Sequence, residues 1–315
     1  MKRQRPALLA ILAAAALGLG APAARAQPLD QMSVLATDLK PQPYPPFTAV
    51  KLSDDLWQIP GSGSNSNVMV LVTDEGLILV DVKYDYQYDD LIKVIREKVS
   101  TKPIKFVIDT HYHADHSGAN VRFLKDGVQV ISSIPGREDI LAKKQPGAPV
   151  GMAPANVTFT GEMRLYLGGK EVRIRHYGPG HTNSDVVVYF PQDRVICVGD
   201  LAHIGDLERG GQYPLIDYIA GGSIGGWIER LNSILADYKF DRVMSGHGTL
   251  GTPADIVAYR DILERVRTDV RAFLADGTKT QADLRTHLNK GPLHWPDPGF
   301  AMVRGLHGLY ADLKP

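Results

Sequence analysis

Cysteine is almost absent from this chain, which has one, Cys197, among 315 residues. A single thiol excludes an intramolecular disulfide, and Cys197 lies within the apolar run 195–198. A chain without disulfides must be held together by its hydrophobic core. About 290 residues follow the N-terminal segment, which is enough to bury such a core.

Long hydrophobic runs are also missing, except near the N-terminus. Residues 7–20 are apolar, follow a basic stretch at 2–5, and precede Ala24, Arg25 and Ala26. A basic start, a short apolar run and a small-residue site are typical of a cleaved secretory signal, and the run is too short to span a bilayer. We therefore expect residues 1–26 to be a signal peptide cleaved near Ala26. The mature protein is then periplasmic or secreted by a bacterium.

An excess of positive charge is lacking as well. Residues 1–26 contain four of the 35 basic side chains and none of the 35 acidic ones, so the remainder has a formal charge of −4. A basic patch is what nucleic acids require. We expect no nucleic-acid partner and no membrane span, but a small-molecule substrate, and the sequence leaves the oligomeric state open.

The pattern of strands and helices predicts an α/β fold. Residues 27–49 are proline-rich and predict an extended segment, and residues 50–315 predict one domain with a helical C-terminal tail. Short β-rich runs alternate with helical periodicity through both halves of this domain. We expect strands at 56–59, 68–72, 77–80, 106–108, 128–131, 164–167, 171–176, 185–190, 194–198 and 242–245, and helices at 85–99, 119–124, 226–238, 253–274 and 281–288.

What the sequence does contain is a dense cluster of metal-ligand side chains. Three of the ten histidines and one aspartate fall within residues 111–116, directly after the apolar run 105–109. Chance histidines in a polar loop are the alternative to a metal site at this position. The cluster consists of His111, His113, Asp115 and His116.

Three further candidate ligands follow expected strands and stand in glycine-containing turns. They are His181, Asp200 and His247. Side chains at strand ends can converge on one rim of a sheet, where open α/β folds place their chemistry. Each of the three residues alone is as well explained by a solvated side chain.

Together these seven residues resemble the pattern of the metallo-β-lactamase-fold hydrolase superfamily, an HxHxDH cluster followed by histidine, aspartate and histidine. The resemblance covers about residues 50–274 and implies a four-layer αββα sandwich with two metals at one edge. It implies that His111, His113 and His181 hold one metal and that Asp115, His116 and His247 hold the other. Asp200 bridges the two on this mapping. Asp81 matches an acid that braces the histidine loop, although a turn acid at a strand end is an equal explanation.

The ligand types indicate two Zn²⁺ ions per chain, while leaving manganese or iron open. In this family the metals supply hydroxide at neutral pH, which attacks a carbonyl carbon, with Asp115 as the catalytic residue that orients the nucleophile and passes on its proton.

Two departures from known branches bear on the substrate. Familiar class B β-lactamases have a cysteine or no protein ligand where this chain has Asp200. Glyoxalase II, which does have the bridging aspartate, ends in a glutathione-binding region that is missing from this short tail. The chain resembles exported, β-lactamase-like zinc hydrolases instead. Asn183, His203, Arg209 and Tyr213 are candidate substrate contacts, and the alternatives are a surface salt bridge for Arg209 and a plain loop position for His203.

Four functions remain open at this point. The leading one is an exported dinuclear zinc hydrolase acting on an ester, thioester, lactone or amide. A true class B β-lactamase is the first alternative, and a mononuclear-iron persulfide dioxygenase is the second. The non-enzymatic alternative, a metal-binding partner protein with a vestigial site, is disfavoured because all seven ligand types are present.

Overall fold

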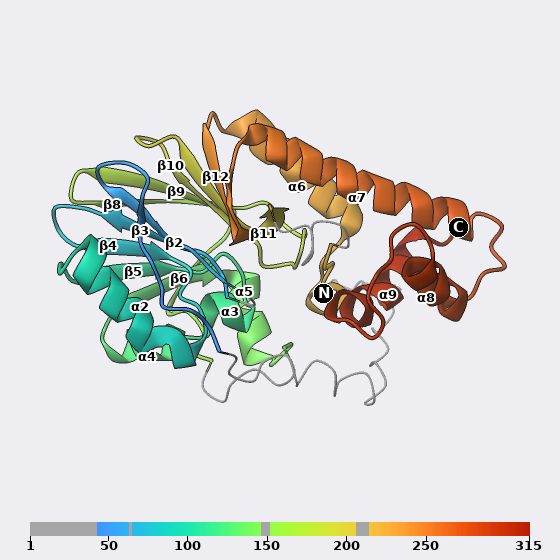
Figure 1. The fold of residues 1–315 in the computed structure, drawn as a ribbon, viewed down its shortest axis with the longest axis horizontal. Coiled ribbons are helices and arrows are strands. Elements are labelled where there is room, and N and C mark those ends of the chain that lie inside the picture. Colours follow the sequence, from blue (N-terminus) through green and yellow to red (C-terminus); the bar gives the residue numbers. More distant parts are fainter. Residues whose placement is uncertain (1–42, 63–64, 146–151, 206–213) are drawn as a thin grey trace, which may run out of the picture.

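Two β-sheets form the centre of the protein (Figure 1). A computed structural model describes residues 43–62, 65–145, 152–205 and 214–315. The first sheet has the strand order β1 to β7, and its members are β1 (Val50–Lys51), β2 (Leu56–Ile59), β3 (Val68–Val72), β4 (Leu77–Val80), β5 (Ile104–Ile108), β6 (Gln129–Ser133) and β7 (Val157–Phe159). The second runs in the order β13 to β8, from β8 (Glu162–Leu167), β9 (Lys170–His176), β10 (Val186–Phe190) and β11 (Val195–Ile204) to β12 (Arg242–Gly248) and β13 (Leu250–Gly251).

Helices cover the outer faces of both sheets. In Figure 1, α2 and α4 lie below the sheets, and α6 and α7 lie above them. The helices are α2 (Tyr88–Val94), α3 (Ala114–Ser117), α4 (Asn120–Lys125), α5 (Ile134–Leu141), α6 (Ile224–Asp237), α7 (Pro253–Leu274), α8 (Gln281–Lys290) and α9 (Phe300–Leu313), with the short segments η1 (Asp85–Gln87), η2 (Ile95–Val99) and η4 (Tyr218–Ala220).

The core consists of three apolar layers. The middle layer joins the facing sides of the sheets and includes Ile78, Ile108, Val188 and Cys197, all of them fully buried. The outer layers lie between each sheet and its helices, for example around Trp227 of α6. Because many of these strands are buried on both faces, their sequences are continuous apolar runs and do not alternate between apolar and polar residues. The four-layer αββα sandwich is therefore confirmed.

Most element predictions are confirmed, with differences at functional positions. β11 continues to Ile204, six residues beyond the expected end, because irregular pairing with β12 lets the strand pass through Gly199. Three elements, α5, β7 and α9, were not predicted, because their short or glycine-containing sequences lack a clear period. Residues 43–49 form no helix or strand, whereas the proposed signal peptide lies outside the described residues.

Within the described part of the chain, no helix combines the length and the apolar character needed to cross a bilayer.

Candidate metal centre

The histidine cluster lies directly after a buried parallel strand. β5 ends at Ile108, and the backbone then leaves the sheet, so that His111 and His113 lie in a turn rather than on a strand. His113 caps the short helix α3 with extended backbone angles, and Asp115 and His116 lie within that helix. The turn and the helix start therefore direct these four side chains to one edge of the sandwich.

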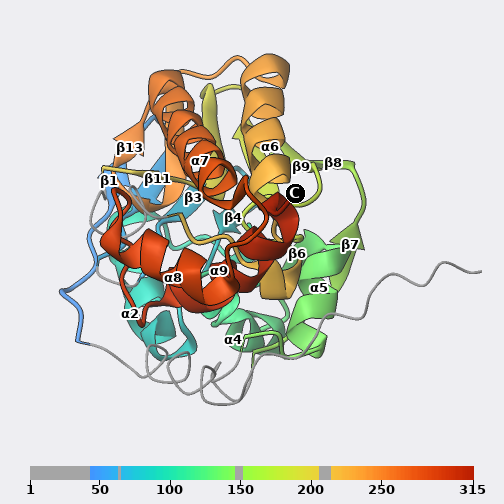
Figure 2. The same ribbon diagram turned by 90° about the vertical axis from the view of Figure 1, so that its right-hand side faces the viewer.

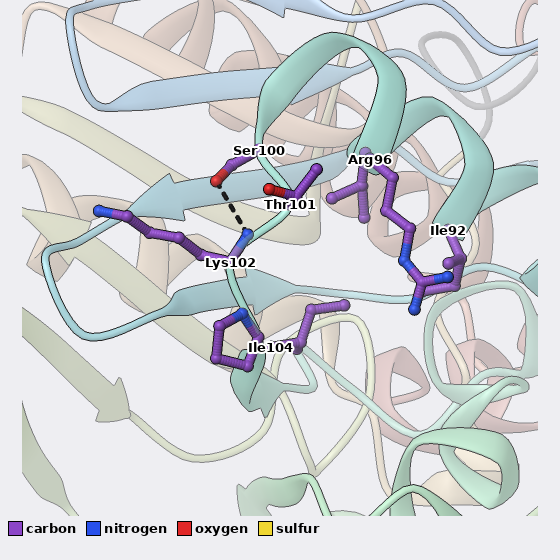
Figure 3. A pocket seen from close by; sticks show the side chains of 8 residues that line it. Ile92, Arg96, Ser100, Thr101, Lys102 and Ile104 are labelled. Carbon is purple, nitrogen blue, oxygen red and sulfur yellow. Dashed lines mark hydrogen bonds between the residues drawn. The ribbon is translucent and has the colours of Figure 1, made fainter.

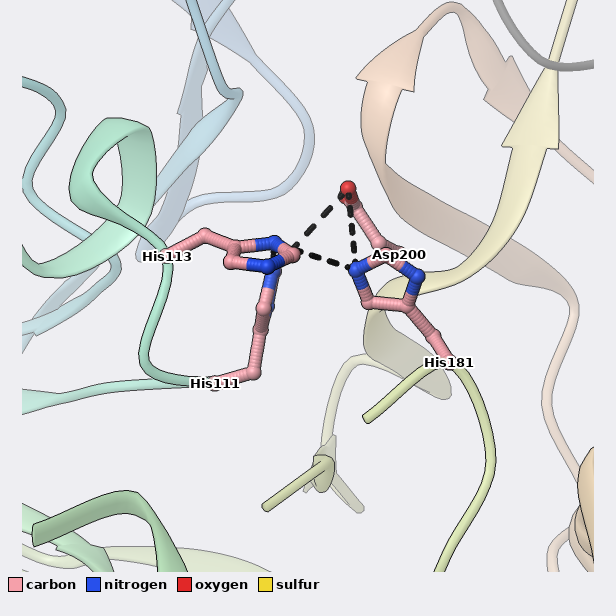
Figure 4. Close-up of side chains that lie close together, drawn as sticks. All are labelled: His111, His113, His181 and Asp200. Atoms are coloured by element: carbon pink, nitrogen blue, oxygen red, sulfur yellow. Dashed lines mark hydrogen bonds and ion pairs between the residues drawn. The ribbon is translucent and has the colours of Figure 1, made fainter. Parts of the chain in front are cut away.

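Three imidazoles from two distant segments converge on one point (Figure 4). His113 Nδ1 lies 3.0 Å from His111 Nε2 and 3.2 Å from His181 Nε2. Zinc–nitrogen bonds of about 2.0–2.1 Å in a tetrahedral site place ligand nitrogens at about this separation. All three side chains are buried, so the ring nitrogens face one another and not bulk water.

A second group lies beside the first. His247 Nε2 lies 3.0 Å from Asp115 Oδ2, and His116 Nε2 lies 3.2 Å from the same oxygen. His247 comes from β12, which pairs with β11 in the second sheet, whereas Asp115 and His116 follow the first sheet. The second group therefore combines residues that belong to the second sheet with residues that follow the first.

Asp200 lies between the two groups. Its Oδ2 is 3.8 Å from His181 Nε2 and 3.6 Å from His247 Nε2, and its Oδ1 is 3.3 Å from His116 Nε2. The irregular stretch of β11 between Cys197 and His203 directs this carboxylate to the sheet edge. All seven residues predicted as ligands are therefore brought together in two adjoining sets.

The arrangement fits metal ions better than it fits hydrogen bonding. His116 Nε2 and Asp200 Oδ1 are buried and make no hydrogen bond within the described part of the chain. Buried polar atoms are costly without a partner, and a cation provides one. A Cβ on Gly246 would lie 1.9 Å from Asp200 Oδ1, so the glycine keeps room for this carboxylate. The donors are nitrogen and oxygen only, which suits Zn²⁺.

The electrostatics favour the metal-binding protonation states of His181, His111 and Asp200, whereas nearby carboxylates raise the pKa of His116 and His247 although burial alone would lower it. Burial lowers the pKa of His181 to about 3, and burial with the neighbouring imidazoles lowers the pKa of His111 well below its usual range. Burial alone would raise the pKa of Asp200, but His247 and His116 hold it well below the usual range. Neutral imidazoles and ionised carboxylates are the forms that bind metals.

Asp81 contacts this site as the sequence suggested. Its Oδ2 lies 2.8 Å from His116 Nδ1, and it accepts hydrogen bonds from the backbone N–H and the hydroxyl of Thr110. Asp81 is fully buried at the end of β4 and has a φ of 62°. A carboxylate on one ring nitrogen fixes the histidine tautomer that presents the other nitrogen, which is the geometry of a ligand brace.

Two further residues that support the histidines were not predicted from the sequence. Asp217 Oδ2 lies 2.9 Å from His113 Nε2 and accepts a 2.7 Å hydrogen bond from the Tyr112 hydroxyl. The carbonyl oxygen of Leu215 lies 2.6 Å from His181 Nδ1. The only signal in the sequence was an acidic residue directly after the apolar pair 215–216.

The four predicted substrate contacts have different outcomes. His203 Nε2 lies 3.6 Å from Asp200 Oδ2, and the His203 ring stacks on His247. Asn183 follows His181 by two residues and has a buried Oδ1 that makes no hydrogen bond to any described residue. Arg209 and Tyr213 lie outside the described residues.

A pocket elsewhere in the protein does not belong to this site (Figure 3). It lies at the amino end of β5, whereas the histidines follow the carboxyl end of the same strand. None of the residues that line this pocket is a typical metal ligand. The lining residues are Ile92, Ile95, Arg96, Ser100, Thr101, Lys102, Pro103 and Ile104.

Residues 61–247 match the model of the metallo-β-lactamase superfamily. The chain belongs to this superfamily and is a metal-dependent hydrolase of it. It is 29% identical over 207 residues to a metallo-β-lactamase type 2 from Bacillus sp. (strain 170), a match that covers 65% of this chain and 75% of the relative. The type 2 enzyme of Bacillus cereus is 28% identical over 213 residues, which are 67% of this chain and 77% of that enzyme.

Solved structures share the fold. A metallo-β-lactamase from Pontibacter korlensis superposes with a TM-score of 0.60 at 22% identity, covering 69% of this chain and 99% of that one. The DIM-1 metallo-β-lactamase gives 0.59 at 21% identity, with 70% and 99% covered. The family match ends at His247, so α7, α8 and α9 lie beyond it.

Proposed function

We propose that the protein is an exported, dinuclear zinc hydrolase that cleaves an ester, thioester, lactone or amide. The observation that carries this proposal is that Asp200 lies within 4.0 Å of ring nitrogens from both ligand sets. A carboxylate shared between two adjoining sets of ligands is suited to bridging two cations.

The ligand roles follow from this position of Asp200. His111, His113 and His181 would hold one Zn²⁺, and Asp115, His116 and His247 would hold the other, with Asp200 as the bridge. Bound in pairs, such ions polarise a carbonyl and supply hydroxide at neutral pH. Manganese or iron would satisfy the same nitrogen and oxygen donors, so metal analysis belongs to the test.

Asp115 is the proposed catalytic residue. Its carboxylate lies on the side of the site formed by His247 and His116, and these imidazoles hold its pKa well below the usual range although burial alone would raise it. An ionised carboxylate there can accept a hydrogen bond from an attacking nucleophile and orient it. Asp81 fixes His116 from the opposite ring nitrogen and so keeps this pair aligned.

His203 and Asn183 are the proposed substrate contacts among the described residues. Both His203 ring nitrogens are buried without a hydrogen-bond partner in the described part of the chain, as is Asn183 Oδ1. Hydrogen-bonding groups of a substrate could satisfy these buried atoms. Arg209 and Tyr213 stay proposals for the same role. We expect His203→Ala to raise KM more than it lowers kcat.

Opening of a β-lactam ring is the second candidate function. It is favoured by the relatives, which are named metallo-β-lactamases and match two thirds of the chain. A β-lactam is itself a strained amide, so the same ligand sets would suffice. A mononuclear-iron persulfide dioxygenase is less favoured, because it would leave the set of Asp115, His116 and His247 without a function.

The first experiment is hydrolysis by the zinc-loaded mature protein, with and without a chelator. A chromogenic cephalosporin, a carbapenem, a thioester and a lactone are the substrates. We expect chelator-sensitive turnover of at least one substrate with kcat/KM of about 10⁴ M⁻¹s⁻¹ or more. Turnover of the β-lactams would establish the second candidate. Turnover that His113→Ala leaves unchanged would contradict catalysis by this metal centre.

Export is tested separately. We expect the protein from the periplasm or medium of an expressing bacterium to begin near Gln27 by mass spectrometry. An intact N-terminus in a cytoplasmic fraction would contradict the proposed signal peptide.

A further inference from the structure

The C-terminal helix α9 lies beyond the family match and yet reaches the metal centre. Figures 1 and 2 show α8 and α9 in red at the end of the sandwich toward which α7 runs. Five apolar side chains of α9 are buried against the rest of the protein: Met302, Val303, Leu306, Leu309 and Leu313. The helix is therefore part of the folded domain and not a loose tail.

We propose that Arg304 of α9 is a positioning residue for the metal centre, which holds His113 in its metal-binding orientation through Asp217. This inference rests on the proposed function, because it concerns how one of the proposed zinc ligands is held. It assigns to the C-terminal helices a part in metal binding that the family match, ending at His247, does not contain.

Arg304 connects three segments around Asp217. It is fully buried, and its Nη2 donates hydrogen bonds to Asp217 Oδ2, to the Tyr112 hydroxyl and to the carbonyl oxygen of Lys144. The Tyr112 hydroxyl donates in turn to the same oxygen of Asp217. Asp217 is itself fully buried, so a guanidinium beside it provides the charge that an ionised carboxylate needs in this setting.

Asp217 transmits this arrangement to a proposed ligand. Its Oδ2 lies 2.9 Å from His113 Nε2, while His113 Nδ1 faces His111 and His181. A carboxylate that accepts from Nε2–H fixes the tautomer whose Nδ1 lone pair is free for a metal. Rotation of Asp217 would therefore remove the orientation of His113 without removing the ligand.

Direct packing reinforces the same contact. The Phe300 ring, in the first turn of α9, lies 6.3 Å from the His113 ring, edge to face, and 5.5 Å from the Arg304 guanidinium carbon. One turn after Arg304, a Cβ on Gly308 would lie 1.9 Å from the ring of Tyr218, the residue that follows Asp217. Residues from two successive turns of α9 therefore contact the segment 217–218.

Stability alone is a poor explanation for a buried arginine here. Arg304 Nε and Nη1 have no hydrogen-bond partner among the residues that the structure describes. A buried ion pair such as Arg304 and Asp217 can commonly be replaced, as a pair, by apolar side chains without loss of stability. Fixing the carboxylate that holds a metal ligand is a role that an apolar side chain could not fill.

The test compares metal affinity in four full-length variants with the parent protein. Arg304→Met removes the positioning charge, and Arg304→Lys keeps the charge without the planar fork. The double variant Arg304→Met, Asp217→Asn removes both charges, which guards against misfolding from an unpaired carboxylate. Arg285→Met is the control, because Arg285 forms an ion pair with Asp297 in the same C-terminal region.

The readouts are competition for Zn²⁺ with a chromogenic chelator, the absorption spectrum of the Co²⁺ form, and the melting temperature of the apoprotein. We expect Arg304→Met and the double variant to bind at least one ion about 10–100-fold more weakly, as loss of a ligand's supporting partner generally does. Arg304→Lys should lie between them and the parent, the Co²⁺ spectrum should change, and Arg285→Met should match the parent.

The inference would be overturned if folded Arg304→Met bound Zn²⁺ with an affinity within two-fold of the parent. If Arg304→Met does not fold, the same result in the double variant would overturn it. The inference would also fail if Arg304→Met lowered the melting temperature of the apoprotein but left metal affinity unchanged. Arg304 would then only anchor α9 to the rest of the domain. A parent protein that binds no Zn²⁺ would instead refute the proposed function itself.

Discussion

At the scale of single residues, the centre depends on the room left around its candidate ligands as well as on the ligands themselves. The carboxylate of Asp200 needs the position that a side chain on residue 246 would occupy, and His116 Cε1 lies 2.8 Å from that same point. From the sequence, Gly246 is predicted only to be a turn residue before His247. Its close approach to a ligand from another strand depends on the pairing of β11 with β12, which the sequence does not reveal.

We therefore expect Gly246→Ala to weaken zinc binding by about ten-fold or more while the sandwich still folds, because Asp200 must move to admit the methyl group. Chelator competition measures the affinity, and circular dichroism checks the fold. Gly225→Ala in α6 is the control, since its Cβ would meet its nearest neighbour at 3.9 Å. Equal zinc affinity in Gly246→Ala and the parent would show that the carboxylate does not need this space.

Lys83 is a buried charge next to the site. Its Nζ donates hydrogen bonds to the carbonyl oxygens of Ser66 and Pro60, and burial lowers its pKa from 10.5 to about 7. The Ser66 hydroxyl donates to the Asp115 carbonyl, so the lysine helps to hold the loop beside α3.

The pH dependence of stability follows from this shift. Between about pH 7 and 10.5 the unfolded chain holds a proton that the folded lysine has lost, so the free energy of unfolding rises with pH by at most about 1.4 kcal/mol per unit. Below about pH 7 both states are protonated and the contribution is constant. Urea unfolding of the parent and Lys83→Met at pH 6.5, 8 and 9.5 should show the parent gaining relative to the variant. A difference between the parent and Lys83→Met that does not change with pH would contradict the lowered pKa of Lys83.

At the scale of elements, the site depends on how the two sheets are joined at one edge. Asn67 precedes β3 in the first sheet, and its side-chain amide donates to the carbonyl oxygens of Ser245 and Gly248 around β12 in the second. Its own Oδ1 accepts from the Gly61 backbone N–H, and the side chain is fully buried. This amide therefore holds the segment of His247 against the first sheet.

Asn67→Ala should lower the free energy of unfolding by about 2–4 kcal/mol, because three backbone groups, one buried and two partly buried, lose the hydrogen bonds of this side chain. It should also weaken metal binding through His247. Urea unfolding of the apoprotein and zinc competition measure the two effects. Asn232→Ala removes an exposed side chain that accepts from Arg260, and should change stability by less than about 0.5 kcal/mol. Similar losses in both variants would argue against a role for Asn67 in joining the sheets.

The sequence predicted elements well where periodicity and turn residues agree. The long amphipathic helix at 253–274 matches α7 at both ends, with a proline at its start. β11 was predicted too short, because the stretch from Gly199 to Ile204 contains the polar residues Asp200 and His203, whose position in a strand only the site explains. α9 was missed, since its two glycines look unfavourable for a helix until Gly308 is seen against Tyr218.

At the scale of the whole molecule, the superfamily and the convergence of the seven candidate ligands were predictable because the motif is compact and specific. The supports of the ligands were not, since Asp217 and Arg304 are 87 residues apart and meet only through the packing of the C-terminal helices on the sandwich. Pairings of that kind depend on tertiary structure and leave no local pattern. The superfamily and the seven candidate ligands can thus be predicted from the sequence, whereas the residues that orient those side chains are found only from the fold.

The most direct test of a two-metal centre is a count of bound zinc after equilibrium dialysis. The account predicts about two Zn²⁺ per chain in the parent protein and about one in each of His181→Ala and His247→Ala, which come from different ligand sets. Fewer than one ion in the parent, or two ions retained in both variants, would contradict it.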